Sequence, residues 1–357
     1  MRKFLVGIIN IDLASILLFL SVLFSSNQAS ACTRVVYHGL NETYITGRNM
    51  DWKTEIPANL WVLPRGVART GNVGRSSIKW KSKYGSVVVS SWDMTSSDGM
   101  NEKGLVGNLL WLTGSEYPKY EKDQDKPGLV ISLWLQYVLD NYETVAEATR
   151  ALSKDNFVVV SSSVPETESY VTVHLSLSDK RGDSAIFEYI NKKLVIHHDK
   201  SYVIMTNAPI YEEQIAINSY WKGISGTVML PGTNRSADRF VRASFYINAV
   251  PKTDDIKIAV PTVFSVIRNV SVPYNISMPD QANISSTRWR AVADHKNLVY
   301  YFENVLNPNI IWLEFKNLDF SEQGRVRKLY LDNNENYSGE SSRYLKIEKP
   351  FQFAMPQ

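Results

Sequence analysis

The stretch Ala29-Ser30-Ala31-Cys32-Thr33-Arg34 places the only cysteine of the chain directly after a small-x-small triplet. The chain opens on a basic pair, Arg2-Lys3, and residues 13–24 are apolar apart from two serines. A basic start, an apolar run and an Ala-x-Ala triplet are the three parts of a secretory signal peptide. We therefore predict that residues 1–31 are a signal peptide and that cleavage after Ala31 makes Cys32 the first residue of an exported protein, periplasmic or secreted.

The apolar run is too short to anchor the chain in a membrane. Asn10 and Asp12 interrupt it upstream, and a bilayer-spanning helix needs roughly 20 apolar residues. No later stretch of the sequence is long and apolar enough to span. We expect a mature protein without a stable membrane span.

Composition indicates an ordinary globular protein. Hydrophobic residues make up 44% of the chain, charged residues make up 21%, and the net charge is only +3 with Lys and Arg scattered. Neither a linker of low complexity nor an internal repeat divides the sequence, so we predict one domain over 32–357. Scattered basic residues do not form the stripe or patch that nucleic acids require, so we expect no nucleic-acid partner.

Cysteine and histidine usage argues against a metal site. One cysteine cannot form an intramolecular disulfide, and an unpaired cysteine in an exported protein is unusual enough to suggest a role. The five histidines are dispersed rather than spaced as metal ligands: His38, His174, His197, His198 and His295. We predict neither a metal nor a cofactor.

Blocks of predicted strands alternate with blocks of predicted helices. Strands are expected at 33–37, 43–46, 60–63, 78–80, 86–92, 105–112, 157–161, 170–177, 184–189, 194–197, 202–205, 286–293, 298–302, 310–315 and 326–331. Helices are expected from 128, at 144–152 with Thr144 as the N-cap, at 212–221, from 236, and at 254–270. Such blocks favour an α+β fold of packed, mainly antiparallel sheets with helical layers outside.

Two local patterns bear on the site. Arg48 and Asp51 are three residues apart on a predicted strand, which places them on opposite faces unless a bulge at Gly47 or Asn49 intervenes. The polar stretch that begins at Ser97 is given no element of its own, and a turn is predicted at residues 101–104, leading into the strand at 105–112.

An amino-terminal cysteine can carry catalysis by itself. Its thiolate is a nucleophile, and its α-amine, with an ordinary pKa of about 7.7–8.0, can take the thiol proton and later return it to a leaving group. Two other interpretations stay open on position alone. Cys32 could be the acylation site of a lipid-anchored binding protein, for which Ala29 is a poor match, or an inert buried thiol.

Five motifs, in order, resemble the choloylglycine hydrolase family, the N-terminal-nucleophile amide hydrolases that include penicillin V acylases and conjugated bile salt hydrolases. The motifs are Cys32-Thr33-Arg34, Gly47-Arg48-Asn49-Met50-Asp51, Asn101-Glu102-Lys103-Gly104-Leu105, Thr206-Asn207-x-Pro209, and Leu230-Pro231-Gly232 followed by Arg239-Phe240-Val241-Arg242. The resemblance extends from Cys32 to about residue 302, which is most of the mature chain.

The resemblance implies a four-layer αββα fold, no cofactor and a homotetramer. It implies that Cys32 is the nucleophile, that Arg48 lies against the thiolate, and that Asp51 orients the α-amine. It further implies that the side-chain N–H of Asn207 contributes to the oxyanion hole and that Arg239 completes the polar shell. Without the resemblance, Arg48 and Asp51 could be a surface ion pair and Asn207 a turn residue.

One position departs from the family pattern. Seven residues after Gly104, where many members have Asn or Tyr, this chain has Trp111. Trp111 and Trp52 resemble the Gram-negative branch of the family, in which tryptophans line the substrate pocket, although core packing also explains them. Paired indoles suit an aromatic or long acyl group, so the expected small-molecule substrates are phenoxyacetyl amides such as penicillin V or N-acyl homoserine lactones. Conjugated bile acids are the alternative.

Overall fold

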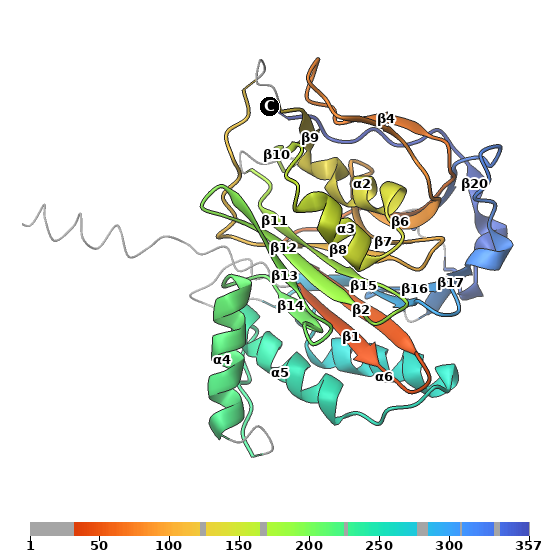
Figure 1. Ribbon diagram of the computed structural model, residues 1–357. Helices are drawn as coiled ribbons and strands as arrows, with labels where there is room; N and C mark the ends of the chain where they lie inside the picture. The colour runs from red at the N-terminus through yellow and green to blue at the C-terminus, as the bar shows by residue number, and fades with distance from the viewer. Residues whose placement is uncertain are drawn as a thin grey trace, which may run out of the picture.

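A computed structural model describes residues 32–121, 126–164, 170–224, 228–276, 285–307, 309–331 and 336–356. The predicted signal peptide lies outside these residues. Two large sheets stack against each other, and helices cover the outer face of each (Figure 1). The predicted αββα arrangement of the N-terminal-nucleophile hydrolases is confirmed.

The first sheet carries the start of the described chain in its interior. Its seven strands run in the order β14-β1-β2-β15-β16-β17-β19. They are β1 (Thr33–His38), β2 (Tyr44–Trp52), β14 (Ile204–Thr206), β15 (Ser286–Asp294), β16 (Val299–Asn304), β17 (Ile310–Glu314) and β19 (Gly339–Glu340). Since Thr33 pairs with Thr206 on one side and with Asn49 on the other, Cys32 lies between the ends of β14 and β2.

The second sheet has nine strands in the order β13-β12-β11-β8-β7-β6-β3-β18-β20. They are β3 (Ala58–Leu63), β6 (Ser86–Ser91), β7 (Thr95–Asn101), β8 (Val106–Trp111), β11 (Val173–Ser178), β12 (Ser184–Ile190), β13 (Lys193–His198), β18 (Arg327–Leu329) and β20 (Lys346–Ile347). Two small ribbons pair β4 (Ala68–Thr70) with β5 (Lys79–Lys81) and β9 (Gly128–Val130) with β10 (Val158–Val160).

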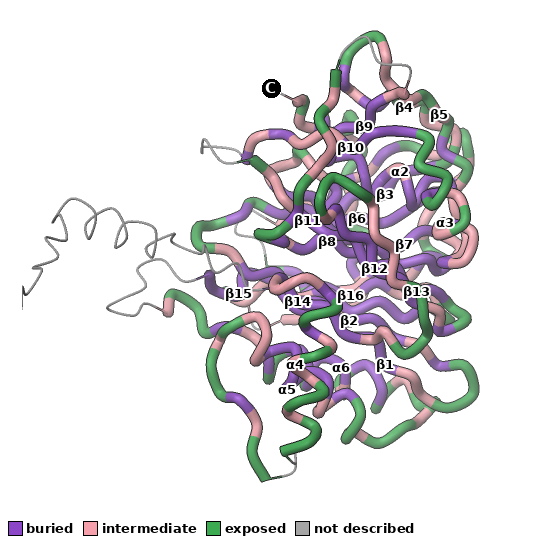
Figure 2. The backbone as a smooth tube through the Cα atoms, turned by 60° about the vertical axis from the view of Figure 1, so that its left-hand side comes forward, coloured by how far each residue is buried: buried purple, intermediate pink, exposed green. Residues whose placement is uncertain are grey.

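Helices form the two outer layers. The second sheet is covered by α2 (Trp134–Asn141) and α3 (Val145–Leu152), and the first by α4 (Tyr211–Ile224), α5 (Ser236–Ala249) and α6 (Ile256–Asn269). Three short 3₁₀ turns complete the described elements: η1 (Ile131–Leu133), η2 (Phe315–Asn317) and η3 (Ser342–Tyr344). Figure 2 shows that burial is concentrated in the strands, while much of α4 is exposed.

The sequence signal for α3 is confirmed in detail. The helix begins at Val145, and the Thr144 hydroxyl accepts a hydrogen bond from the N–H of Glu147 at 3.2 Å. A side-chain acceptor at this position satisfies one of the N–H groups that the first helical turn leaves without a partner. The predicted starts of the three later helices are also within two residues of those observed.

In and beside the second sheet, one strand was not predicted and one helix start is wrong. The polar stretch at Ser97 belongs to β7, in the middle of the second sheet, because its buried polar groups find partners there. Ser96, for example, donates to Gln136 Oε1 at 2.8 Å. The helix expected from Gly128 begins only at Trp134, since residues 128–130 form β9, which pairs with β10.

Candidate active site

The Cys32 thiol is buried at the beginning of β1, where 2% of the residue is exposed. The main-chain N–H of Asp51 donates to Cys32 Sγ at 3.4 Å, and Arg48 Nη2 lies 3.8 Å from the same sulfur. Both groups present positive charge or partial positive charge to sulfur.

Arg48 and Asp51 lie on opposite faces of the first sheet, as a regular strand requires. Arg48 reaches across to the second sheet and donates to the Leu109 carbonyl at 2.9 Å. Asp51 instead faces the helical layer, where its carboxylate pairs with Arg239 of α5 at 3.7 Å. The bulge considered at Gly47 or Asn49 is absent, because β2 pairs with β1 in continuous register.

The register shift lies in the neighbouring strand instead. In β15, Arg288 is the extra residue between Thr287, which pairs with Asp51, and Trp289, which pairs with Met50. The Thr287 hydroxyl thereby donates to Asp51 Oδ1 at 2.5 Å. The site therefore uses both faces of β2 and needs no distortion of that strand.

A buried carboxylate behind Arg48 was not predicted from the sequence. Asp98 of β7 lies 3.4 Å from Arg48 Nη1 and accepts hydrogen bonds from Asn108 at 2.7 Å and from the Tyr300 hydroxyl at 2.6 Å. Burial raises the pKa of Asp98, and the Arg48 guanidinium opposes that rise. Trp289 packs against the other side of Arg48, with the guanidinium carbon 4.5 Å from the ring centroid. These contacts fix the guanidinium beside the thiol.

Asp51 is the titratable group with the clearest shift in the site. No part of it is exposed, and burial raises the pKa of its carboxyl to about 6. Arg239 and the Thr287 hydroxyl oppose this rise. Asn49, two residues earlier on the same face, donates to both carboxylate oxygens at 3.1 Å.

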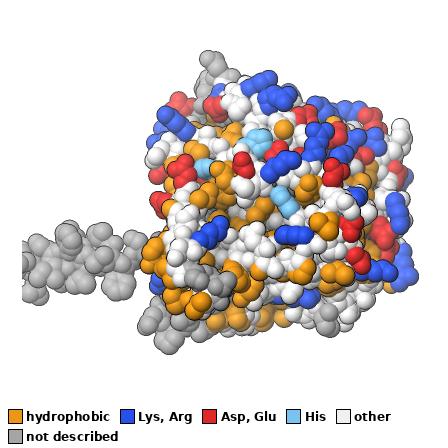
Figure 3. Space-filling model, turned by 60° about the horizontal axis from the view of Figure 1, so that its bottom comes forward, with side chains coloured by type: hydrophobic (Ala, Val, Ile, Leu, Met, Phe, Trp, Pro, Cys, Tyr) orange, Lys and Arg blue, Asp and Glu red, His pale blue; other side chains and the backbone are white. Residues whose placement is uncertain are grey.

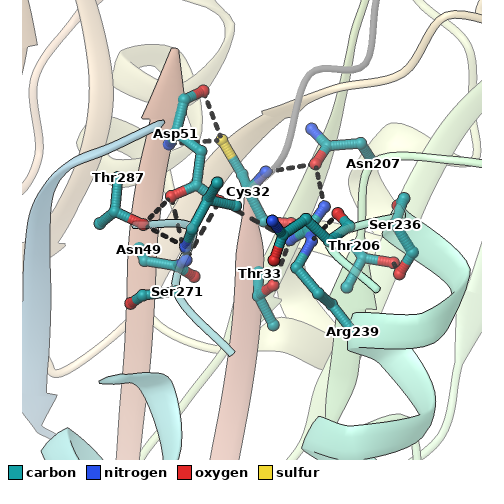
Figure 4. Close-up of polar contacts among 12 residues, drawn as sticks. Cys32, Thr33, Asn49, Asp51, Thr206, Asn207, Ser236, Arg239, Ser271 and Thr287 are labelled. Atoms are coloured by element: carbon teal, nitrogen blue, oxygen red, sulfur yellow. Dashed lines mark hydrogen bonds and ion pairs between the residues drawn. The ribbon is translucent and has the colours of Figure 1, made fainter. Parts of the chain in front are cut away.

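Asn207 and Arg239 surround the main chain of Cys32 (Figure 4). The Cys32 N–H donates to Asn207 Oδ1, while Asn207 Nδ2 donates to the Trp111 carbonyl at 2.8 Å. Arg239 donates from Nη1 to the Cys32 carbonyl at 2.7 Å and from Nη2 to Asn207 Oδ1 at 3.3 Å.

The fold thus brings Cys32, Arg48, Asp51, Asn207 and Arg239 together, and their catalytic roles stay predictions. Two details differ from the roles expected of them. In this chain the Cys32 nitrogen is an amide joined to Ala31, and its partner is Asn207 rather than Asp51. The Asn207 side-chain N–H is bonded to Trp111, so its role towards an oxyanion stays a prediction.

A pocket adjoins the thiol. Trp52 and Trp111 both line it, with their ring centroids 5.4 Å apart and their planes at 62°, and Trp92 lies 6.3 Å from Trp52. Most of the other lining side chains are also apolar: Met50, Ile56, Met94, Leu109, Ile131, Val164, Val171 and Val173. A mainly apolar pocket beside a nucleophile suits the acyl part of a small molecule.

The described residues contain neither a cluster of metal ligands nor a membrane-spanning helix. Within them, no group of three or more His, Cys, Asp or Glu side chains is placed to hold a metal ion. None of the helices in the same ranges has the length and hydropathy needed to cross a membrane.

Comparison with known proteins gives a consistent picture. Residues 32–335 match the profile of the linear amide C–N hydrolases, choloylglycine hydrolase family. The chain is 48% identical to a penicillin V acylase of Pectobacterium atrosepticum, over 91% of this chain and 92% of that protein. It is 25% identical to a bile salt hydrolase/transferase of Clostridium perfringens, over 82% of this chain and 95% of that protein.

Solved structures agree with this. The penicillin V acylase from Agrobacterium tumefaciens superposes with a TM-score of 0.85 at 55% identity, covering 91% of this chain and all of that one. The R18L variant of a conjugated bile acid hydrolase from Clostridium perfringens has a TM-score of 0.72 at 20% identity, covering 86% of this chain and 99% of the other. That second likeness concerns the fold alone.

Proposed function

This chain belongs to the choloylglycine hydrolase family and is a linear amide C–N hydrolase, and we propose that it acts as an acylase on amides with aromatic or long acyl groups. One observation carries the proposal: the Cys32 thiol, flanked by Arg48 and a main-chain N–H, borders an apolar pocket lined by paired indoles. Penicillin V and N-acyl homoserine lactones are the proposed substrates.

The proposed reaction begins once the peptide bond before Cys32 is cut and its nitrogen is an amine. The amine takes the thiol proton, and Cys32 Sγ attacks the amide carbonyl to form a C–S bond. Asn207 and main-chain N–H groups are the proposed donors to the oxyanion, a contribution worth roughly 10²–10³ in rate for each donor. The C–N bond then breaks and the leaving amine receives the proton.

The second half of the proposed reaction releases the acid. Water adds to the thioester carbonyl while the α-amine accepts its proton, and the C–S bond breaks to regenerate the thiol. Asp51 is the proposed orienting group for the amine, since Arg239 Nη1 contacts both the Asp51 carboxylate and the Cys32 carbonyl. Asn49 and Thr287 already hold this carboxylate in place. Arg48, on the other face, is the proposed counter-charge of the thiolate.

The choice among acyl groups rests on the pocket and on the relatives. Indole rings meeting edge to face form a rigid apolar surface suited to a phenoxy ring or an alkyl chain. The penicillin V acylase relative is also considerably more similar than the bile salt hydrolase relative, at 48% against 25% identity. Conjugated bile acids are therefore the second candidate.

A hydrolysis panel tests the proposal. Protein beginning at Cys32 is incubated with penicillin V, a long-chain acyl homoserine lactone and glycocholate, and the released amines are quantified. We expect turnover of the first two, weak or no turnover of glycocholate, and none in a folded Cys32→Ala variant. Preferential hydrolysis of glycocholate would overturn the substrate assignment, and full activity in Cys32→Ala would overturn the mechanism.

Export and assembly are further parts of the proposal. We infer a periplasmic or secreted protein with an unmodified Cys32 at its start, and intact mass distinguishes this from a lipid-anchored form carrying a diacylglyceryl adduct. A homotetramer is the proposed assembly. Apolar side chains are exposed on α4, shortly after it and on α6: Tyr220, Val228, Met229 and Ile258. Figure 3 shows the face of the molecule at the bottom of Figure 1, where hydrophobic side chains are exposed among polar and charged ones.

A further inference from the structure

The C-terminal segment forms part of the wall of the pocket beside the thiol. Residues 336–356 follow the part of the chain that matches the family profile, which ends at residue 335. Ala354 nevertheless lines the same pocket as Cys32 and the paired indoles. One wall of this pocket is therefore built from sequence that the family profile does not cover.

Main-chain hydrogen bonds hold Ala354 in place from two sides. Its N–H donates to the Met94 carbonyl at 2.8 Å, and its carbonyl accepts from the Ser132 hydroxyl at 2.8 Å. Met94 follows β6, Ser132 belongs to η1, and both line the pocket. Because these bonds use only main-chain atoms of Ala354, a change of its side chain leaves them intact.

Aromatic packing fixes the residues just before Ala354. Phe351 lies against Trp61 with 5.1 Å between ring centroids, and Phe353, which is 8% exposed, lies 4.6 Å from Phe351 and beneath the Arg69 guanidinium at 5.6 Å. Both phenylalanines pack against the hydrophobic core around α2. The segment is thus anchored in the core, so a side chain added at Ala354 cannot easily be relieved by displacing the segment.

We propose that Ala354 is a specificity-determining residue whose small side chain sets the size of the acyl group that the pocket accepts. The inference rests on the proposed acylase function. The methyl group of Ala354 takes up little room at this wall of the pocket. A larger side chain would fill space that a long acyl group needs, while the two hydrogen bonds of residue 354 go to Met94 and Ser132 rather than to the groups that contact Cys32.

The test compares two tryptophan variants in the C-terminal segment. Ala354→Trp places an indole at the pocket wall, whereas Gln352→Trp, two residues earlier, places one on an exposed position. Both are assayed with wild type on N-acyl amides that share one amine and carry acyl groups from short to long. For Ala354→Trp we expect kcat/KM to fall by at least about tenfold for the longest acyl group and to change by less than about twofold for the shortest. Gln352→Trp should match wild type throughout.

Several outcomes separate this inference from the proposed function. An equal loss on every amide, or no loss on the longest, would overturn the role of Ala354 while leaving the acylase assignment intact. A wild-type protein that hydrolyses none of the amides would instead overturn the proposed function. If Ala354→Trp does not give the wild-type unfolding transition, Ala354→Leu is assayed in its place, and the same dependence on acyl length decides.

Discussion

Cys32 connects two different chemical environments within one residue. Its sulfur lies between the sheets near Arg48, while its main-chain nitrogen and carbonyl contact Asn207 and Arg239 on the side of the helical layer. The thiol and the main-chain nitrogen can therefore be influenced by different neighbours. Arg48 and its partner Asp98 lie on the side of the sulfur, and Asn207 and Arg239 contact the main chain.

The raised pKa of Asp51 predicts a pH dependence of stability. Burial raises this pKa from 3.8 to about 6, so the folded protein binds the proton more tightly than the unfolded chain does. The contribution of Asp51 to the free energy of unfolding should therefore fall as pH rises from 4 to 7, by up to about 3 kcal/mol.

Denaturant unfolding of wild type and Asp51→Asn at pH 4, 5, 6 and 7 measures this effect. The difference between the two proteins isolates the one carboxyl, since Asp98, whose pKa burial also raises, is present in both. Relative to the variant, wild type should lose stability as pH increases. A difference that stays constant over this range would contradict the prediction.

Motifs in the sequence identified the residues whose chemical types are informative by themselves. The single cysteine after the Ala-x-Ala triplet can be recognised without a structure, and so can the Arg-x-x-Asp pair. Asp98, Tyr300 and Thr287 were missed because their roles depend on partners that are 50, 202 and 236 residues away. No local pattern distinguishes a buried, paired aspartate from one in a polar turn.

At the scale of elements, the close approach of α6 to β2 depends on Gly47. A Cβ atom at this position would lie 2.6 Å from Val263 Cγ1 and 3.0 Å from Ile267 Cγ2, both on α6. Contacts this short force side chains or the helix to move. Because β2 also carries Arg48 and Asp51, a displaced α6 would disturb the strand that positions both residues.

Gly47→Val should therefore destabilise the protein by about 1–3 kcal/mol through overpacking. Gly223→Ala is the matched control, since nothing lies within 4 Å of that position in α4. Alanine in place of a helical glycine should stabilise by about 0.5–1 kcal/mol. Urea denaturation measures both changes, and a neutral Gly47→Val would show that α6 adjusts at no cost.

Prediction of elements succeeded where the hydrophobic pattern was regular and failed where polar groups were buried. The helix caps and most strands have local signals, as Thr144 does. The polar strand β7 has none, because its stability comes from bonds such as those of Ser96 and Asp98 with neighbouring elements. The short strand β9 was hidden in an apolar run that continues into η1 and α2, where composition does not separate strand from helix.

At the scale of the whole molecule, the site is assembled from both sheets and from α5. The site forms when these layers pack together. We propose that its chemistry also requires the removal of residues 1–31. A precursor in which Cys32 remains joined to Ala31 has no α-amine to take the thiol proton. We therefore expect a folded but inactive precursor.

Blocking the cleavage tests this expectation. A double variant, Ala29→Glu with Ala31→Glu, removes both small residues that signal peptidase requires. Intact mass should show the retained leader, and hydrolysis of penicillin V should fall to the level of Cys32→Ala. Protein expressed from Met-Cys32, whose initiator methionine is removed, should be active. Wild-type turnover by a protein with a leader still attached would contradict the expectation.

The side chains of β2 alternate between the two faces of the first sheet, and this affects how such an enzyme can change over evolution or by design. The pocket wall lies between the sheets, whereas the Asp51–Arg239 cluster lies on the opposite face of the first sheet. Changes at separated sites without shared partners usually combine additively. Acyl preference can therefore diversify at positions such as Ala354 while the groups around the Cys32 main chain are inherited unchanged, which allows one reaction to be adapted to many acyl donors.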